Sequence, residues 1–197
     1  MAVATGDEDD IRERILTGYK DGKPFTPYVP TLRLPAPIDR VLDFGCGLGR
    51  NFPFLRRAAR TVAGFDLPPM IERCRTAASE PIDLLTSDWD CLKVMSFDVI
   101  VASLVLQHVE PSPVREFLDD FARMAPAVYL LTRIRTDFDE NILDIVAQTG
   151  RYDADECVEV DHDPVTHQLR VLGRMPFDEA RTGGGDRHYE LLLKSRR

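Results

Sequence analysis

The chain has 197 residues, of which 44% are hydrophobic, so it is long enough to form one domain around a buried core. Its formal net charge of −8 argues against a nucleic-acid-binding protein, because such proteins usually carry a basic face. No segment approaches the ~20 apolar residues of a membrane span, and the acidic N-terminus lacks the character of a signal peptide. The four cysteines show no metal-type spacing, which favours free thiols in a reducing cytoplasm.

The first 39 residues have a different pattern from the rest of the chain. Apolar residues recur at helical spacing from Ile11 to Tyr19, which predicts a short amphipathic helix. Prolines then crowd the stretch 24–37, which is expected to run extended. We therefore divide the chain into an N-terminal segment, 1–39, and a ligand-binding domain, 40–197.

From residue 40 onward, short apolar runs alternate with amphipathic segments. The expected strands are 40–44, 61–65, 82–86, 97–103 and 127–133, and the expected helices are 49–59, 69–79, 113–124 and 138–148. Alternation of this kind predicts an α/β fold with a parallel sheet and helices on both faces. The last part of the chain has strand-like runs instead, at 156–161, 167–173 and 187–194, which predict an antiparallel ending.

The most informative stretch is the first predicted strand and the turn after it. The apolar run ends in an acidic residue and then breaks into three glycines at alternating positions: Asp43, Gly45, Gly47 and Gly49. Glycine accepts positive φ and has no Cβ, so it allows a ligand to lie against the backbone. The second strand ends at Asp66, about twenty residues on, where a ribose-binding carboxylate belongs in a nucleotide-binding βαβ unit.

The spacing of the glycines indicates which class of cofactor the loop binds. A dinucleotide fingerprint requires a third glycine at the position that Arg50 occupies here. Asp43 would also repel a diphosphate, whereas it suits a cationic ligand, reached directly or through backbone and water. A ligand with a ribose, an adenine and an amino group but no phosphate fits best. That description matches S-adenosylmethionine.

Residues 41–109 resemble a class I S-adenosylmethionine-dependent methyltransferase, with four motifs in the family's order. The resemblance implies a Rossmann-like, seven-stranded, mostly parallel sheet with a C-terminal antiparallel hairpin. It also implies a cofactor site in which the glycine loop holds the methionine part, Asp66 the ribose and Asp88 the adenine. The cofactor-binding residues implied in this way are Asp43, Gly45, Cys46, Gly47, Gly49, Asp66, Leu67, Asp88, Trp89 and Ser103.

For two residues near the expected adenine site, the resemblance leaves the role open. The loop after Asp66 is one residue shorter than the family's and contains two prolines, so Met70 is not assigned to the adenine. Trp89 either covers the adenine ring or belongs to an ordinary core.

His108 is the candidate catalytic base and substrate contact, because it follows the fourth strand and an imidazole suits proton removal at neutral pH. The alternative is a histidine that only holds its loop. Tyr19 and Tyr28 are assigned to the substrate site, on a leading segment that is either a lid or a tether; simple packing is the alternative for both. No metal site is expected, and Asp137 and Asp139 are interpreted as ordinary loop residues.

The sequence therefore predicts an enzyme that transfers a methyl group from S-adenosylmethionine to a small-molecule acceptor and releases S-adenosylhomocysteine. Nucleic-acid and membrane partners are not expected. Two other readings keep the same fold and cofactor, namely a non-catalytic regulatory module and a methyltransferase with a protein or RNA acceptor. A nicotinamide-dependent oxidoreductase is disfavoured by Arg50 and by the lack of a hydride-transfer dyad.

Overall fold

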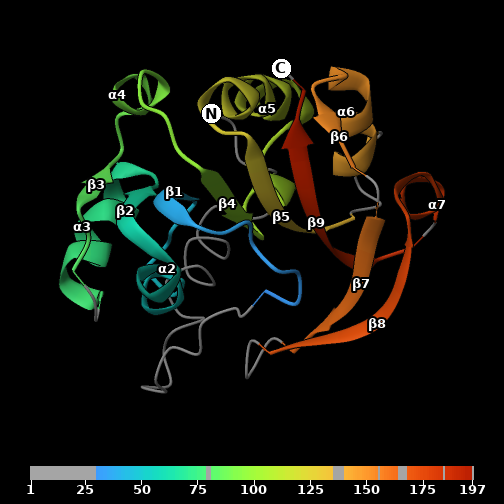
Figure 1. Cartoon of the computed structure of the whole chain (residues 1–197), viewed down its shortest axis with the longest axis horizontal. Coiled ribbons are helices and arrows are strands. Elements are labelled where there is room, and N and C mark those ends of the chain that lie inside the picture. Colours follow the sequence, from blue (N-terminus) through green and yellow to red (C-terminus); the bar gives the residue numbers. More distant parts are fainter. Residues whose placement is uncertain are drawn as a thin grey trace.

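A computed structural model describes residues 30–78, 81–134, 140–154, 156–163, 168–183 and 185–196. These residues form one sheet with helices on both of its faces (Figure 1). The strands are β1 (Ile38–Phe44), β2 (Ala59–Phe65), β3 (Leu84–Thr86), β4 (Val99–Ser103), β5 (Ala127–Arg133), β6 (Tyr152–Asp153), β7 (Glu156–His162), β8 (Leu169–Pro176) and β9 (His188–Ser195). The helices are α2 (Phe52–Ala58), α3 (Pro68–Ala77), α4 (Trp89–Lys93), the 3-10 helix η1 (Leu106–His108), α5 (Pro111–Met124), α6 (Ile142–Thr149) and α7 (Phe177–Thr182).

The sheet has the order β3-β2-β1-β4-β5-β9-β7-β8, and β6 pairs with β9. The first five strands are parallel, and β9, β7 and β8 pair antiparallel with their neighbours. This arrangement confirms the predicted Rossmann-like fold with an antiparallel C-terminal part. The described sheet has nine strands, because the two-residue β6 and the outer strand β8 extend it beyond the seven expected. Figure 1 shows β7 and β8 continuing the sheet at the end opposite α3.

The residue patterns explain why these elements form. The first four residues of β4 are all buried, as expected of a central parallel strand that is covered on both faces. In α5 the buried side chains are Val114, Leu118, Phe121 and Met124, whose spacing places them on one stripe of the helix. Prolines stand in the first turn of α5, where their missing N–H groups have no helical partner.

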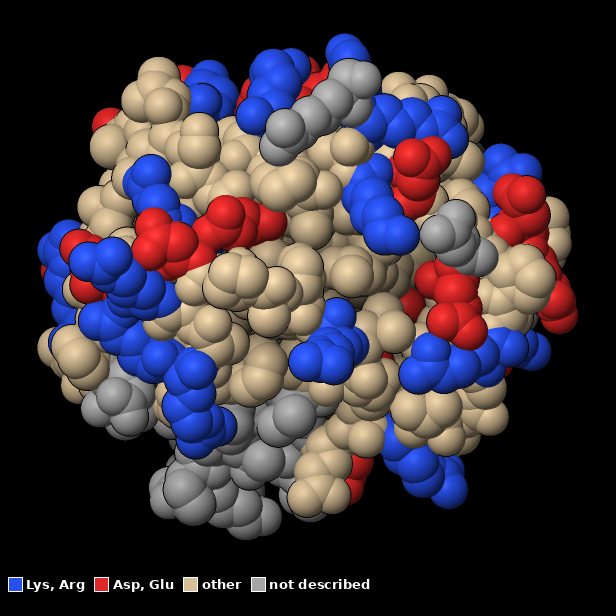
Figure 2. Space-filling model, viewed as in Figure 1, with Lys and Arg blue, Asp and Glu red and all other residues tan. Residues whose placement is uncertain are grey.

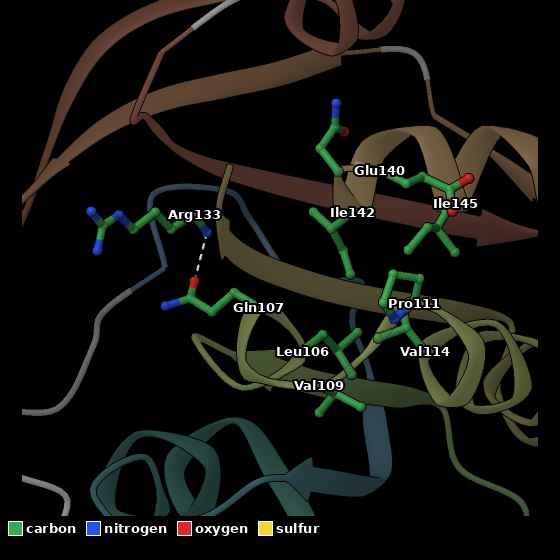
Figure 3. Close-up of a pocket in the computed structure, with 10 residues that line it drawn as sticks. Leu106, Gln107, Val109, Pro111, Val114, Arg133, Glu140, Ile142 and Ile145 are labelled. Atoms are coloured by element: carbon green, nitrogen blue, oxygen red, sulfur yellow. Dashed lines mark hydrogen bonds between the residues drawn. The ribbon is translucent and has the colours of Figure 1, made fainter. Parts of the chain in front are cut away.

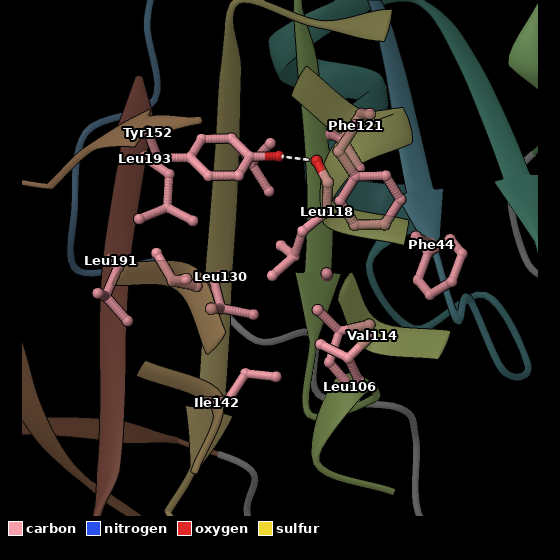
Figure 4. Close-up of a cluster of buried hydrophobic side chains, with 14 of the residues drawn as sticks. Phe44, Leu106, Val114, Leu118, Phe121, Leu130, Ile142, Tyr152, Leu191 and Leu193 are labelled. Atoms are coloured by element: carbon pink, nitrogen blue, oxygen red, sulfur yellow. Dashed lines mark hydrogen bonds between the residues drawn. The ribbon is translucent and has the colours of Figure 1, made fainter. Parts of the chain in front are cut away.

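The core has two layers, one on each face of the sheet. On one face, leucines of β5 and β9 point toward the buried stripe of α5, together with Ile142 of α6 (Figure 4). The hydroxyl of Tyr152 donates to the carbonyl of Leu118 within this layer. On the other face, Phe52 of α2 and Ile71 of α3 pack over β1 and β2. Because both layers are packed, the carboxyl ends of the parallel strands are held at one edge of the sheet.

Three short helices were missed by sequence analysis. Helices α4 and α7 and the 3-10 helix η1 have only five, six and three residues, too few for a helical period to be recognised. The longer helices were predicted with shifted ends. The segment expected at 138–148 is helical from Ile142, while residues 138 and 139 lie outside the described residues.

The predicted helix 11–19, Tyr19 and Tyr28 also lie outside the described residues, so the proposed division at residue 39 stays a prediction. In the described part, Thr31 is hydrogen-bonded to Glu190 of β9 through its backbone N–H, at 2.8 Å, and through its hydroxyl. None of the described helices is long and apolar enough to cross a membrane.

Candidate active site

Three glycines shape the loop that joins β1 to α2. Gly45, Gly47 and Gly49 have φ values of +74°, +56° and +82°, a region that side chains disfavour. A Cβ atom on Gly45 would lie 2.4 Å from Cγ2 of Val105, and one on Gly49 would lie 2.5 Å from the ring of Phe52. The first and third glycines are therefore required by close packing as well as by backbone conformation.

Asp66 fastens this loop to the end of β2. One carboxylate oxygen accepts the N–H of Gly47 and the other accepts the N–H of Leu67, each at 2.7 Å. The amide of Cys46 also donates to the carbonyl of Phe65 at 3.0 Å. Burial raises the pKa of Asp66, and the two backbone hydrogen bonds oppose that rise. A carboxylate has about four acceptor positions, so two remain for a ligand.

Asp43 lies beneath the glycine loop and is completely buried. Burial raises the pKa of its carboxyl group to about 7; a hydrogen bond from Asn51 opposes the rise and the charge of Asp66 adds to it. The side-chain amide of Asn51 donates to Oδ1 of Asp43 at 3.1 Å. Within the described part of the chain, Oδ2 of Asp43 has no hydrogen-bond partner.

Asp88 and Trp89 stand together at the start of α4, after β3. Asp88 is exposed and accepts the N–H of Cys91 at 3.1 Å, so it caps the helix. Trp89 is half-buried, and its indole N–H donates to Asp120 of α5 at 2.8 Å. Its ring lies within 6 Å, centroid to centroid, of four phenylalanine rings: Phe44, Phe65, Phe117 and Phe121. These contacts anchor Trp89, and its contact with adenine stays a prediction.

The chain that leaves β4 runs directly against the glycine loop. Ser103 is half-buried at the end of the strand, and Leu104 follows with a φ of +53°, an uncommon conformation for a residue other than glycine. The N–H of Leu104 donates to the carbonyl of Leu131 at 2.7 Å. After Val105, η1 carries His108, which is exposed.

A narrow pocket opens at the carboxyl edge of β4 and β5, between η1, α5 and α6 (Figure 3). It has about 300 Å³ of empty space, part of it open to solvent. We call it the acceptor-side pocket. Its apolar lining consists of Leu106, Val109, Pro111, Val114, Ile142 and Ile145. Its polar lining consists of Gln107, Arg133, Glu140 and Asn141.

The charged groups at the rim of this pocket are engaged in ion pairs. Arg133 is paired with Asp186, and Arg115 with Glu140. Figure 2 shows a run of neighbouring basic side chains down the side on which α2 and α3 lie, and basic and acidic side chains interspersed over the rest of that face. The rim can therefore form hydrogen bonds with a ligand, but its paired charges do not create a strong positive or negative electrostatic potential.

The residues present fit S-adenosylmethionine. Asp66 retains acceptor positions for hydroxyl groups, next to the backbone of the glycine loop. The buried Asp43, whose Oδ2 has no partner among the described residues, can supply negative charge near the same loop when it is ionised. These groups lie at the carboxyl ends of β1 and β2, where open α/β sheets bind ligands.

Comparison with known proteins agrees with this assignment. Residues 41–126 match the family model described as a methyltransferase domain, which contains the glycine loop, Asp66 and η1. This match covers less than half of the chain, and together with the fold and the geometry of the site it supports a class I S-adenosylmethionine-dependent methyltransferase with S-adenosylmethionine as its cofactor. No curated protein sequence matches the chain.

Several solved structures share the fold at low sequence identity. The N-methyltransferase NodS from Bradyrhizobium japonicum, in complex with S-adenosyl-L-homocysteine, superposes with a TM-score of 0.55 and 16% identity, over 96% of this chain and 88% of its own. A TehB-like methyltransferase from Corynebacterium glutamicum gives 0.54 and 14%, over 96% of each chain. The magnesium protoporphyrin IX methyltransferase from Synechocystis, with S-adenosylmethionine bound, gives 0.51 and 14%, over 96% of this chain and 79% of its own.

Sequence analysis did not identify four residues of this site: Asn51, Leu104, Gln107 and Arg133. Asn51 and Gln107 stand next to residues that were considered, but their partners come from other elements. Leu104 has an ordinary side chain, and only its backbone is unusual. Among the described residues there is no group of three or more histidine, cysteine, aspartate or glutamate side chains that could hold a metal ion.

Proposed function

We propose that this methyltransferase transfers the methyl group of S-adenosylmethionine to a small-molecule acceptor that occupies the acceptor-side pocket. The observation that carries the proposal is that a residue in contact with the cofactor loop directly precedes the pocket lining in the chain. Val105 packs against Gly45, and the pocket lining begins at the next residue, Leu106. A molecule in the pocket would therefore lie beside the loop assigned to the methionine end of the cofactor.

The lining favours a compact acceptor with an apolar body and a polar end. Six of the ten lining residues are apolar. The four polar ones are Gln107, Arg133 and the two residues that directly precede α6. The magnesium protoporphyrin IX methyltransferase of Synechocystis, which shares the fold, is named for a small-molecule substrate. The four free thiols suit a reducing compartment, which supports a cytoplasmic location.

The contacts of Gln107 orient His108, the proposed base. Oε1 of Gln107 accepts the backbone N–H of Arg133 at 2.6 Å, which fixes the orientation of the amide because a backbone N–H can only donate. The amide nitrogen of Gln107 then lies 3.3 Å from Nε2 of His108. An amide NH₂ can only donate, so Nε2 of His108 is the acceptor in this contact and must release Gln107 before it takes a proton from the substrate.

The remaining roles follow from the resemblance. Asp66 binds the ribose hydroxyls, Asp43 supports the positively charged methionine end, and Asp88 and Trp89 bind the adenine. Because the sulfonium is already an activated donor, these residues and the pocket act mainly by aligning donor and acceptor. Tyr19 and Tyr28 belong to the proposed leading segment and lie outside the described residues.

A screen of methyl acceptors tests the proposal, with formation of S-adenosylhomocysteine as the readout. For an acceptor that is turned over, Val109→Phe should raise KM at least tenfold by filling the pocket, while His108→Ala should lower kcat at least a hundredfold. Both variants should bind S-adenosylhomocysteine like the wild type. Val94→Phe, at a side chain that is 86% exposed, is the matched control and should change neither constant.

Three outcomes would count against parts of the proposal. Unchanged KM in Val109→Phe would place the acceptor elsewhere, and unchanged kcat in His108→Ala would remove that residue from the mechanism. Methylation of protein or RNA fractions with no small molecule accepted would favour the macromolecular alternative.

A further inference from the structure

Two buried polar side chains meet beneath the glycine loop. Asp43 is 0% exposed and Asn51 is 7% exposed, so neither can satisfy its hydrogen-bonding groups with bulk water. They share one hydrogen bond, from Nδ2 of Asn51 to Oδ1 of Asp43, at 3.1 Å. Asp43 lies near the end of β1, and Asn51 directly precedes α2.

Each of these side chains also has a buried oxygen without a partner in the described part of the chain. The two atoms are Oδ2 of Asp43 and Oδ1 of Asn51. An ionised carboxylate and an amide oxygen are both acceptors, so neither can satisfy the other. A proton on Oδ2 of Asp43 changes this, because the carboxylic acid can then donate to Oδ1 of Asn51. The carboxyl group would then present one donor and one acceptor to the amide, in place of two acceptors.

The surroundings of Asp43 favour the protonated form. The charged group that acts on it is Asp66, which repels the ionised form, and the other neighbouring titratable groups are the buried thiols of Cys46 and Cys74. Burial is the largest cause of the raised pKa of Asp43, about 7, and exceeds the opposite effect of Asn51. Without a cation nearby, the carboxyl group therefore keeps its proton up to neutral pH.

We propose that binding of the cofactor is coupled to the loss of a proton from Asp43. In the cofactor-free protein, Asp43 is a neutral acid paired with Asn51. When the cationic methionine end enters the glycine loop, Asp43 becomes a carboxylate and its proton passes to the solvent. Asn51 is a positioning residue that holds the carboxyl group in both states. This inference uses the cofactor assignment and does not depend on the identity of the acceptor.

The coupling has a defined sign. Since the cofactor binds the deprotonated form, its affinity should rise by up to about tenfold per pH unit below the pKa of Asp43 and become constant above it. If Asp43 served only to maintain the conformation of the loop, its replacement would change the cofactor affinity by the same factor at every pH. The pH profile of binding therefore separates the two roles without any measurement of turnover.

Calorimetric titration with S-adenosylhomocysteine at about pH 6.5, in phosphate and in imidazole buffer, counts the protons exchanged. We expect the wild type to release between about half a proton and one proton per bound ligand. At this pH the ligand's own amino group is already protonated, because α-amino groups titrate near 7.7–8.0, so it contributes little. Asp43→Asn should bind without proton release and with an affinity independent of pH.

Asp66→Asn is the matched control, since it should bind more weakly while its proton release persists. Difference infrared spectra give a second readout, in which the C=O band of a protonated carboxyl group disappears on binding in the wild type but not in Asp43→Asn. Equal heats in the two buffers for the wild type would overturn the proposal. So would proton release that persists in Asp43→Asn. Both outcomes leave the methyltransferase assignment intact, so failure of this inference is distinguishable from failure of the proposed function.

Discussion

The two protonation states of Asp43 have opposite effects: the proposed cofactor binding needs the carboxylate, whereas folding favours the protonated carboxyl group. Its pKa is about 7 in the folded protein against 3.8 for the ordinary group, so the folded state holds this proton over a range in which the unfolded chain has lost it. The free energy of unfolding should therefore fall as the pH rises from about 4 to about 7, and stay low above that.

Asp43→Asn tests this conflict through stability alone. At pH 8 the variant should be more stable than the wild type by on the order of 1–4 kcal/mol, because the amide removes a buried charge. At about pH 4.5 the two proteins should be nearly equal. Urea denaturation of the cofactor-free proteins at both pH values measures the difference. A variant that is less stable by the same amount at both values would contradict the explanation.

Asp66 has two tasks, since the same carboxylate fastens the glycine loop and is assigned to the ribose. Asp66→Ala should weaken binding of S-adenosylhomocysteine at least tenfold, because it removes charge-assisted hydrogen bonds worth roughly 1.5–3 kcal/mol. Asp39→Ala is a suitable control, because Asp39 is an exposed carboxylate at the opposite end of the parallel strands. Calorimetry measures both affinities, and equal binding by the two variants would remove Asp66 from the cofactor site.

At the scale of elements, the parallel half of the sheet could be predicted from sequence almost residue by residue. Strands β1, β2 and β5 lie within two residues of their expected ends, because each is an apolar run bounded by clear turn signals. The helix expected at 113–124 begins two residues earlier, at the first of two prolines. Gly150 ends α6 with a φ of +60°, a left-handed conformation that glycine adopts readily at helix ends.

The elements that line the acceptor-side pocket were harder to predict. Helix η1 has three residues and no period of its own, and its neighbour Leu104 has a positive φ that no side-chain pattern indicates. The contact between Gln107 and Arg133 joins positions 26 residues apart, so it depends on how β5 lies beside β4. The cofactor loop could be found from its motif because glycine spacing is local, whereas the pocket arises from packing.

Helix α6 supplies one wall of that pocket, and its first turn depends on Asn141. Oδ1 of Asn141 accepts the N–H groups of Leu143 and Asp144 at 2.9 and 3.0 Å. Asn141→Ala should destabilise the protein by about 1 kcal/mol, and Asn141→Ser should recover most of this because serine also caps helices. Urea denaturation gives the stability, and hydrogen exchange at the amides of Leu143 and Asp144 should quicken only in the alanine variant.

At the scale of the whole molecule, Glu190 connects the start of the described chain to its last strand. This completely buried carboxylate accepts the N–H and hydroxyl of Thr31 and the hydroxyl of Tyr129. Burial, and next the nearby charge of Glu190, raise the pKa of Tyr129 well above its usual range, so the phenol remains a donor. Residues 31 and 190 are thereby held together across nearly the full length of the sequence.

Thr31→Val keeps the backbone donor and removes the hydroxyl. The variant should lose about 1–3 kcal/mol of unfolding free energy, because a buried charged acceptor loses one of its donors. Thr76→Val is the control, since that hydroxyl bonds only to the carbonyl of Arg73 on an exposed part of α3 and its loss should change stability by less than about 0.5 kcal/mol. Equal effects in the two variants, measured by urea denaturation, would show that the link to Glu190 contributes little.

The contact between Gly45 and Val105 has a consequence for how such an enzyme can change over generations. The two positions share one small volume, in which a Cβ on residue 45 would lie 2.4 Å from the side chain of residue 105. Substitutions at either position are therefore constrained by the donor side of the reaction. From residue 106 onward the residues line the proposed acceptor site. Selection can remodel that part for a new substrate while the machinery that holds the methyl donor is inherited unchanged.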